Sequence, residues 1–257
     1  MSTTDVTEDA FLGGQVMVRQ PKSGYRAGLD AVLLAASIQC ETGQICRVLD
    51  VGAGVGTVGL CVAARCAQAE VTLLEREPRL AALAGENVAL NRLKARVRVV
   101  NAEVGSPATM LAADGLHADA FDHVLSNPPY HGEGRGTAAP DALKAMSHAM
   151  PEANLDGWVR FMARMVKSGG TATMVHKADV LPAILSAFAG RFGGVRVLPI
   201  YPREGEVANR VIVQGIKGSR APMILLPGFV LHADGNAFTP AAQAVLRDGA
   251  GFLVRTG

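Results

Sequence analysis

The sequence lacks the features that mark several classes of protein. No apolar run reaches the roughly 18 uncharged residues that a membrane-spanning helix needs. The first ten residues contain acids but no base, so they do not resemble a secretory signal peptide. The 25 basic and 23 acidic residues nearly cancel, so any binding to nucleic acid must use a local basic patch. We therefore expect a cytoplasmic protein with no membrane partner.

Cysteine and histidine are present without the spacings that usually give them a function. The four cysteines form no CxxC pair, so we expect reduced thiols in a reducing cytoplasm; they are Cys40, Cys46, Cys61 and Cys66. The six histidines show no metal-ligand spacing, and no Ser/His/Asp or Cys/His arrangement stands out. The sequence therefore predicts neither a metal site nor a nucleophilic triad.

Short apolar runs alternate with helical patterns along most of the chain. With 257 residues, 49% of them hydrophobic, the chain is long enough to bury a large core. The predicted strands are 47–51, 70–75, 97–100, 121–126, 171–175, 195–200 and 210–216. The predicted helices are 29–38, 58–67, 78–91, 155–166 and 180–188. This alternation predicts an α/β, Rossmann-like fold with a seven-stranded, mostly parallel sheet covered by helices on both faces.

A glycine-rich run, DVGAGVG at residues 50–56, follows the first strand of this series and precedes a helix. Glycines there allow close approach of the backbone to a nucleotide. A GxGxxG pattern at Gly54, Gly56 and Gly59 suggests a dinucleotide, but Asp50 would face its pyrophosphate with like charge. The DxGxGxG pattern is instead the first motif of class I methyltransferases that use S-adenosyl-L-methionine (SAM). SAM carries a cationic sulfonium and ammonium, which suit a nearby carboxylate.

Polar residues at the ends of the next two strands extend this cofactor prediction. Glu75 ends its strand 23 positions after Gly52, where a carboxylate accepts hydrogen bonds from ribose hydroxyls. Ala102 and Glu103 follow the third strand, at the place where methyltransferases contact the adenine ring of SAM. The predicted cofactor residues of the core are therefore Asp50, Gly52, Gly54, Glu75, Ala102 and Glu103.

An Asn-Pro-Pro-Tyr sequence, residues 127–130, follows the fourth strand. The two prolines fix a stiff turn and leave carbonyl groups without a local partner. A planar amino group could donate to both the Asn127 side-chain oxygen and the Pro128 carbonyl. Tyr130 offers a flat face for stacking a base. The predicted catalytic residues are Asn127, Pro128 and Tyr130.

Together, DxGxGxG and NPPY resemble the amino-methyltransferases, which methylate adenine N6 in DNA and RNA or glutamine in peptide release factors. Residues 23–34 and the Leu-Pro-Gly and Ala-Asp-Gly-Asn sequences within 226–236 resemble the bacterial tRNA (adenine-N6)-methyltransferases that modify valine tRNA beside the anticodon. This resemblance spans about residues 11–246. It implies SAM as cofactor, S-adenosyl-L-homocysteine as product, Tyr25 and Asp30 near the cofactor, and Asn127 bordering both cofactor and amine.

Two other functions stay open. One is a glutamine-amide methyltransferase acting on a release factor or other protein. Those enzymes carry a helical domain of several dozen residues before the glycine run, whereas the 49 residues before Asp50 include a glycine-rich hairpin. The other is a catalytically silent RNA-binding protein of the same fold. The intact glycine run and Asn127 argue against the second.

A tRNA partner would need local basic residues, and we expect a monomer or weak dimer. The candidates are Arg19, Lys22, Arg26, Arg135, Lys144, Arg203, Arg210, Lys217 and Arg220. Residues 131–140 are predicted to be a lid that orders on substrate. We expect three parts: residues 1–45, a mobile tail over 1–10 with a hairpin and a helix over the SAM site; 46–217, the methyltransferase domain; and 218–257, a hairpin around Pro227-Gly228 followed by a helix on the same domain.

Overall fold

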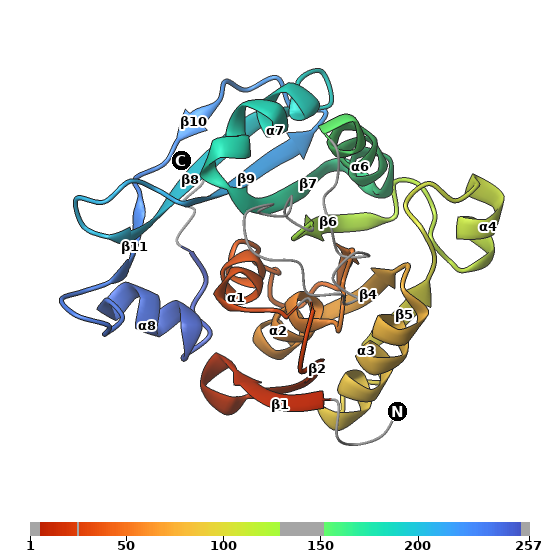
Figure 1. Cartoon of the computed structure of the whole chain (residues 1–257). Helices are drawn as coiled ribbons and strands as arrows, with labels where there is room; N and C mark the ends of the chain where they lie inside the picture. The colour runs from red at the N-terminus through yellow and green to blue at the C-terminus, as the bar shows by residue number, and fades with distance from the viewer. Residues whose placement is uncertain (1–5, 25, 129–151, 253–257) are drawn as a thin grey trace, which may run out of the picture.

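The computed structural model describes residues 6–24, 26–128 and 152–252 (Figure 1). Its strands are β1 (Val6–Phe11), β2 (Val16–Pro21), β3 (Cys46–Val51), β4 (Ala69–Glu75), β5 (Val97–Asn101), β6 (Phe121–Ser126), β7 (Val166–Lys177), β8 (Phe192–Arg203), β9 (Arg210–Lys217), β10 (Ile224–Leu225) and β11 (Phe229–His232). Its α-helices are α1 (Leu29–Ala36), α2 (Thr57–Arg65), α3 (Pro78–Leu90), α4 (Ala108–Ala113), α6 (Glu152–Met165), α7 (Leu181–Phe188) and α8 (Pro240–Leu246). Short 3-10 helices are η1 (Leu12–Gly14) and η2 (Ala178–Val180).

The central sheet has the order β10-β8-β9-β7-β6-β3-β4-β5, and β11 also pairs with β8. The strands β3, β4, β5, β6 and β7 are parallel to one another, whereas β9 runs antiparallel to both β7 and β8. The prediction of a Rossmann-like, mostly parallel sheet is confirmed. The seven predicted strands correspond to β3 through β9, and the two short strands β10 and β11 extend the sheet beyond them.

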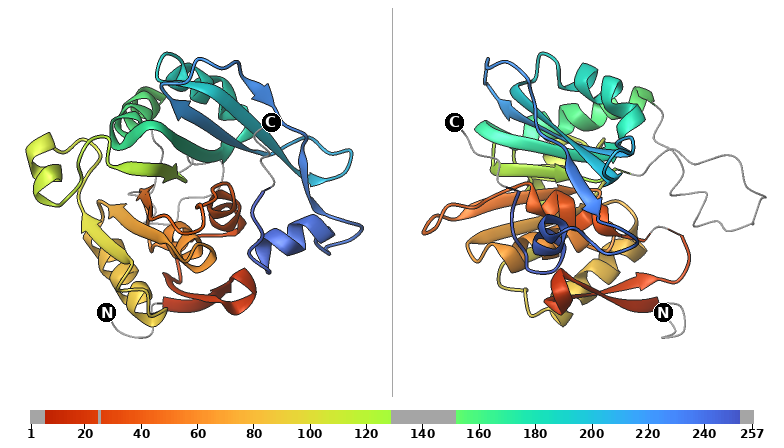
Figure 2. Two further views of the ribbon diagram at one scale, coloured as in Figure 1. Left: turned by 180° about the vertical axis from the view of Figure 1, so that it is seen from behind. Right: turned by 90° about the vertical axis from the view of Figure 1, so that its left-hand side faces the viewer.

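Helices cover both faces of the sheet, as the apolar strands require (Figure 2). Successive residues of a strand point to opposite faces. Accordingly, Val48 of β3 joins the core beneath α1, α2 and α3, whereas Leu49 joins the core beneath α4, α6 and α7. The two cores hold the strand ends in fixed positions, so side chains at one edge of the sheet have a rigid support.

The N-terminal hairpin, β1 with β2, packs beside α2 and α3 (Figure 1). The prediction of a mobile tail over the first ten residues is wrong from β1 onward, because β1 pairs with β2 along its whole length. Its acidic residues have basic partners: Glu8 pairs with Arg19 at 3.2 Å, and Asp9 pairs with Arg26 at 2.7 Å. A charged stretch can therefore form a strand here.

The C-terminal segment also differs from the prediction. β10 and β11 each pair in parallel with β8, and not with each other, so the predicted hairpin around Pro227-Gly228 is wrong. The long β8 offers a free edge on which both short segments add in turn. A Cβ on Gly228 would lie 2.1 Å from the Tyr201 ring, so the connection passes directly over this side chain. The predicted helix in this segment is α8, and the Thr239 hydroxyl caps its first turn by accepting a hydrogen bond from Ala242 N–H at 3.1 Å.

Two smaller differences concern element boundaries. The prediction omitted α4 altogether, and it left Gly169 and Gly170 between the helix over 155–166 and the strand over 171–175. In the structure α6 ends at Met165 and β7 begins at the next residue, so the two glycines lie inside the strand. A glycine pair indicates a break in a helix but does not locate the helix end.

Candidate active site at the switch point of the sheet

The two predicted motifs meet at one edge of the sheet. β3 lies between β4 and β6, because the chain builds β4 and β5 on one side of β3 and then crosses to build β6 on the other. Ligands of open α/β sheets bind outside the carboxyl ends of strands at such a switch point. The last residues of β3 and β6, Val51 and Ser126, are direct partners although 75 positions separate them. This pairing places the glycine run beside the Asn-Pro turn.

The glycine loop, residues 52–56, follows β3. Gly52, Gly54 and Gly56 have φ of 72°, 56° and 89°, which residues with a Cβ adopt only at a cost. The Gly52 and Ala53 N–H groups both donate to the Leu74 carbonyl of β4 at 2.9 Å. The loop therefore turns sharply back across the end of β4 before α2 begins.

Glu75 fixes the middle of this loop. Its carboxylate is buried, and one oxygen accepts a hydrogen bond from Gly54 N–H at 2.8 Å. The other oxygen accepts from Glu77 N–H, also at 2.8 Å. A carboxylate has about four acceptor positions, so each oxygen retains capacity for one more donor. Glu75 thus supports the loop while keeping capacity for a ligand.

Asp50 lies below the loop, 1% exposed, and accepts a hydrogen bond from Gly59 N–H of α2 at 3.1 Å. A Cβ on Gly59 would lie 2.3 Å from Leu73, so α2 approaches β4 as closely as glycine allows. Burial raises the pKa of the Asp50 carboxyl to about 7; the Gly59 N–H bond opposes this rise and the charge of Glu75 adds to it. Asp50 is therefore easier to protonate than an exposed aspartate.

Trp158 of α6 was not among the predicted site residues, yet it joins the two motifs. Its indole N–H donates to the Ser126 hydroxyl at 2.8 Å, and that hydroxyl donates to the Val51 carbonyl at 3.0 Å. A Cβ on Gly52 would lie 2.9 Å from the indole ring. The only sequence signal was that a partly buried tryptophan needs an acceptor for its N–H, which does not say where that acceptor lies.

The catalytic prediction falls partly within the described structure. Asn127 is 8% exposed and directly follows β6, beside the glycine loop. Pro128 is the next residue of the turn. Tyr130, Tyr25 and the predicted lid over 131–140 lie outside the described residues. The structure therefore brings Asn127 and Pro128 to the same edge as Asp50 and Glu75.

Three other predicted cofactor residues occupy different surroundings. Ala102 is partly buried and packs against the core beneath α4. The exposed Glu103 pairs with Arg76 at 3.7 Å, and Asp30 of α1 pairs with Arg210 of β9 at 3.0 Å. Asn101, the last residue of β5 and the one before Ala102, donates from its side chain to the Glu75 and Arg76 carbonyls at 2.8 and 3.0 Å. These two bonds fix the end of β5 against the end of β4.

Most of the described basic residues predicted to contact phosphate are held in ion pairs within the chain. These pairs are Arg19 with Glu8, Arg26 with Asp9, Arg203 with Glu206, Arg210 with Asp30 and Lys217 with Asp119. The pair of Arg210 with Asp30 is partly buried, whereas both side chains of the Arg19–Glu8 and Arg203–Glu206 pairs are exposed. Lys22 and Arg220 are exposed, and Arg135 and Lys144 lie outside the described residues.

The described part of the chain has no arrangement typical of a metal centre or a membrane span. Within residues 6–24, 26–128 and 152–252, no group of three or more His, Cys, Asp or Glu side chains is arranged to hold a metal ion. No helix in those same ranges is long and apolar enough to cross a bilayer. The four cysteines are free thiols.

Comparison with known proteins identifies several related sequences. Curated relatives named tRNA1(Val) (adenine(37)-N6)-methyltransferase include one from Bacteroides thetaiotaomicron, 28% identical over 204 residues that cover 77% of this chain and 80% of the relative. Another, from Escherichia coli O157:H7, is 31% identical over 145 residues, or 56% of each chain.

Solved structures give the same fold. A predicted O-methyltransferase, Atu636 from Agrobacterium tumefaciens, is 32% identical with a TM-score of 0.74, covering 89% of this chain and all of that one. M. jannaschii TYW2 in complex with AdoMet has a TM-score of 0.52 at 15% identity, covers 82% of this chain and 85% of that one, and shares the fold alone. The model of the Methyltransferase small domain family matches residues 26–180, which include both motifs and more than half of the sequence. This chain therefore belongs to the methyltransferase small domain family.

Proposed function

We propose that this methyltransferase transfers a methyl group from SAM to the exocyclic N6 amine of an adenine in tRNA, near the anticodon, and releases S-adenosyl-L-homocysteine. One observation carries the proposal: the glycine loop and the Asn127-Pro128 turn follow neighbouring strands at the switch point. The curated relatives are named for methylation of adenine 37 in a valine tRNA, which supports tRNA as the substrate class.

The residues at the switch point fit SAM. Asp50 and Glu75 supply two buried carboxylates for a cationic ligand, and each Glu75 oxygen can accept a further bond from a ribose hydroxyl. Gly52 and Gly54 have no side chain to block the loop. The related fold of M. jannaschii TYW2 was solved with AdoMet. When bound, SAM supplies an electrophilic methyl group on its sulfonium.

The Asn127-Pro128 turn is assigned to the amine. The Asn127 side-chain oxygen and the Pro128 carbonyl would each accept one N–H of a planar amino group. These bonds hold the nitrogen in line and leave it more electron-rich. Positioning of this kind provides effective molarities up to about 10⁵–10⁸ M in good cases, and the product loses its proton to solvent, so no dedicated base is required. Tyr130 is assigned to stacking on the base.

The remaining predicted residues are assigned to other parts of the cofactor. Ala102 and Glu103 follow β5, on the far side of Glu75 from the glycine loop, and are assigned to the adenine end of SAM. Tyr25 and Asp30 are assigned to the side nearest α1, where Asp30 is held by Arg210. Atu636 is described as a predicted O-methyltransferase, whose methyl acceptor would be an oxygen. In this chain the Asn127 amide oxygen and the Pro128 carbonyl are both hydrogen-bond acceptors, which suit an N–H donor and therefore an amine as methyl acceptor.

The test is methyl transfer from radiolabelled SAM into total tRNA taken from a strain that lacks this gene, followed by nucleoside analysis. Label in N6-methyladenosine is the expected result. If SAM binds but no RNA is labelled, the substrate assignment fails, and a release-factor glutamine becomes the next candidate. If SAM does not bind at all in a calorimetric titration, the catalytic assignment fails and a silent RNA-binding role replaces it.

A further inference from the structure

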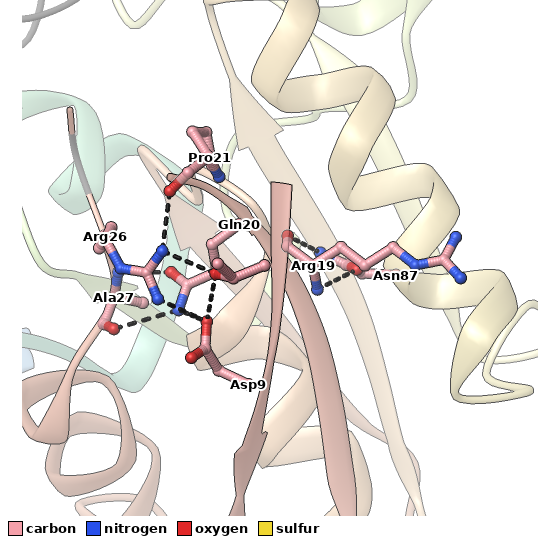
Figure 3. Close-up of polar contacts among 8 residues, drawn as sticks. Asp9, Arg19, Gln20, Pro21, Arg26, Ala27 and Asn87 are labelled. Carbon is pink, nitrogen blue, oxygen red and sulfur yellow. Dashed lines mark hydrogen bonds and ion pairs between the residues drawn. The ribbon is translucent and has the colours of Figure 1, made fainter. Parts of the chain in front are cut away.

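Asn87 of α3 and Asn91, the residue that directly follows this helix, dock the N-terminal hairpin. The Asn91 side chain donates to the Met17 carbonyl at 2.7 Å and accepts from Met17 N–H at 2.9 Å. The Asn87 side chain repeats this with Arg19, at 3.0 and 2.8 Å (Figure 3). A side-chain amide presents the same donor and acceptor as a peptide group. The two amides therefore take the place of a neighbouring strand along the edge of β2 that β1 does not use.

Asn87 makes one contact that Asn91 does not. The second hydrogen of its amide goes to the carbonyl of Val55 in the glycine loop, at 3.0 Å. The corresponding hydrogen of Asn91 returns to its own helix, at the Asn87 carbonyl. Asn87 has no exposed surface, so water has no access to take its place as the hydrogen-bond donor to the Val55 carbonyl. One buried side chain thus bridges the hairpin and the glycine loop.

The glycine loop needs such an external partner. Gly54 and Gly56 flank Val55, and glycine has the widest conformational freedom of any residue. Glu75 fixes the Gly54 N–H, and Asn87 fixes the Val55 carbonyl one residue later. Two buried side chains from different elements therefore define the direction of this part of the loop.

The hairpin in turn holds Arg26 and Ala27 of the lead-in segment, residues 26–28, that precedes α1. The buried Gln20 accepts from Ala27 N–H at 2.7 Å and donates to Asp9 and the Ala27 carbonyl. Arg26 donates to Asp9 and to the Pro21 carbonyl (Figure 3). A continuous set of polar contacts therefore runs from the lead-in segment through β2 to Asn87 and the glycine loop.

We infer that Asn87 is a positioning residue that couples docking of the N-terminal hairpin to the conformation of the glycine loop, and so to SAM affinity. The effect on SAM rests on the proposed function; the coupling between hairpin and loop does not. Hairpin docking and SAM binding then stabilise one another, because coupling between two binding events is reciprocal.

The experiment compares Asn87→Ala with the matched control Asn91→Ala in the full chain. Each variant loses two hydrogen bonds to one residue of β2, Met17 for Asn91→Ala and Arg19 for Asn87→Ala. Only Asn87→Ala also loses the bond to the Val55 carbonyl. SAM affinity by calorimetry should fall about tenfold or more in Asn87→Ala, as expected for one lost buried hydrogen bond, and by less than about twofold in Asn91→Ala. Equal losses of affinity in the two variants, or no loss in either, would overturn the inference.

Amide hydrogen exchange separates the coupling from the cofactor assignment. In the ligand-free variants, exchange of residues 52–57 should rise in Asn87→Ala and stay unchanged in Asn91→Ala, while β2 exchanges faster in both. A second measurement uses the wild-type protein and so does not depend on a variant that folds. There, SAM should slow amide exchange at Met17 and Arg19 as well as in the glycine loop. Protection confined to the loop contradicts the coupling; absence of any SAM binding contradicts the proposed function alone.

Discussion

The glycine loop and the Asn127-Pro128 turn follow adjacent strands, yet different interactions hold them. The loop is held by buried polar partners from β4 and α3, Glu75 and Asn87, while Asp50 of β3 holds the helix α2 that follows it. The turn has a proline ring that fixes φ, and its base is anchored by neutral groups, Ser126 and Trp158. If the proposed assignments are correct, we expect the cofactor side of the site to respond to charge and pH, and the amine side to respond to geometry.

The largest effect should come from Asn127→Ala. If the turn acts only on the amine, methylation of tRNA should fall by about three orders of magnitude or more, a loss comparable to removing one oxyanion-hole donor. SAM affinity should stay within about threefold, because the glycine loop is untouched. Single-turnover methylation and calorimetry measure the two quantities. Activity equal to the wild type would remove Asn127 from the catalytic assignment.

Gly52→Ala tests the contact between the two regions. The alanine would have to adopt a φ of 72°, and its Cβ would lie 2.9 Å from the Trp158 ring. The positive φ costs about 1–2 kcal/mol and the overpacking about 1–3 kcal/mol, so we expect the free energy of unfolding to fall by about 2–5 kcal/mol. Gly43→Ala is the matched control, since Gly43 has a φ of 85° with open space around it. An equal loss in both variants would show that Trp158 yields without cost.

The pH dependence of SAM binding sharpens the contrast in charge. The pKa of Asp50 is raised to about 7, and a bound cation would lower it, so binding releases a proton. SAM affinity should therefore rise by up to about tenfold per pH unit below pH 7 and level off above it. Calorimetry across pH 5.5–8.5, as an order-of-magnitude window around that pKa, should show this slope in the wild type and not in Asp50→Asn.

The ligand-free protein should show the opposite sign. An acid whose pKa is raised on folding stabilises the folded state while protonated, and this stabilisation is lost as pH rises from about 4 to about 7. Denaturant unfolding should show that loss as the difference between the wild type and Asp50→Asn. A difference independent of pH would mean that Asp50 does not titrate in this range.

Trp158→Phe should give the smallest effect. The ring is largely kept, while the hydrogen bond to the Ser126 hydroxyl is lost, which costs about 1 kcal/mol of folding stability. We expect SAM affinity to be nearly unchanged and kcat to fall a few-fold, because the turn loses its anchor. Because the wild type has one tryptophan, its fluorescence should also respond to SAM through the Gly52 contact. Tryptophan fluorescence of the wild type that does not change at saturating SAM would contradict the placement of Trp158 beside the cofactor loop.

Residues with strong local preferences made much of the site predictable. Glycines at 52, 54 and 56 indicate a tight turn, and the two prolines of NPPY indicate a stiff one, whatever the rest of the chain does. Glu75 was predicted from its place at a strand end, and the structure puts it against the loop. Its bond to Gly54 N–H was not predicted, because that contact depends on how β4 pairs with β3.

Contacts between distant elements were predicted less well. The Met-Ile-Leu-Leu and Phe-Val-Leu runs on either side of Pro227-Gly228 suggest a hairpin, yet each pairs with the free edge of β8. Asn87 and Trp158 carry no local pattern, and their partners at Val55 and Ser126 lie 32 residues away in both cases.

The sequence by itself determined the class of fold and the glycine turn after β3, because glycine permits backbone conformations that other residues avoid and apolar runs define buried strands. The tertiary structure alone decided which buried side chain reaches which loop. Those contacts depend on strand order and helix packing, which bring together groups with no shared local signal. The coupling of the N-terminal hairpin to the glycine loop through Asn87 belongs to this second kind.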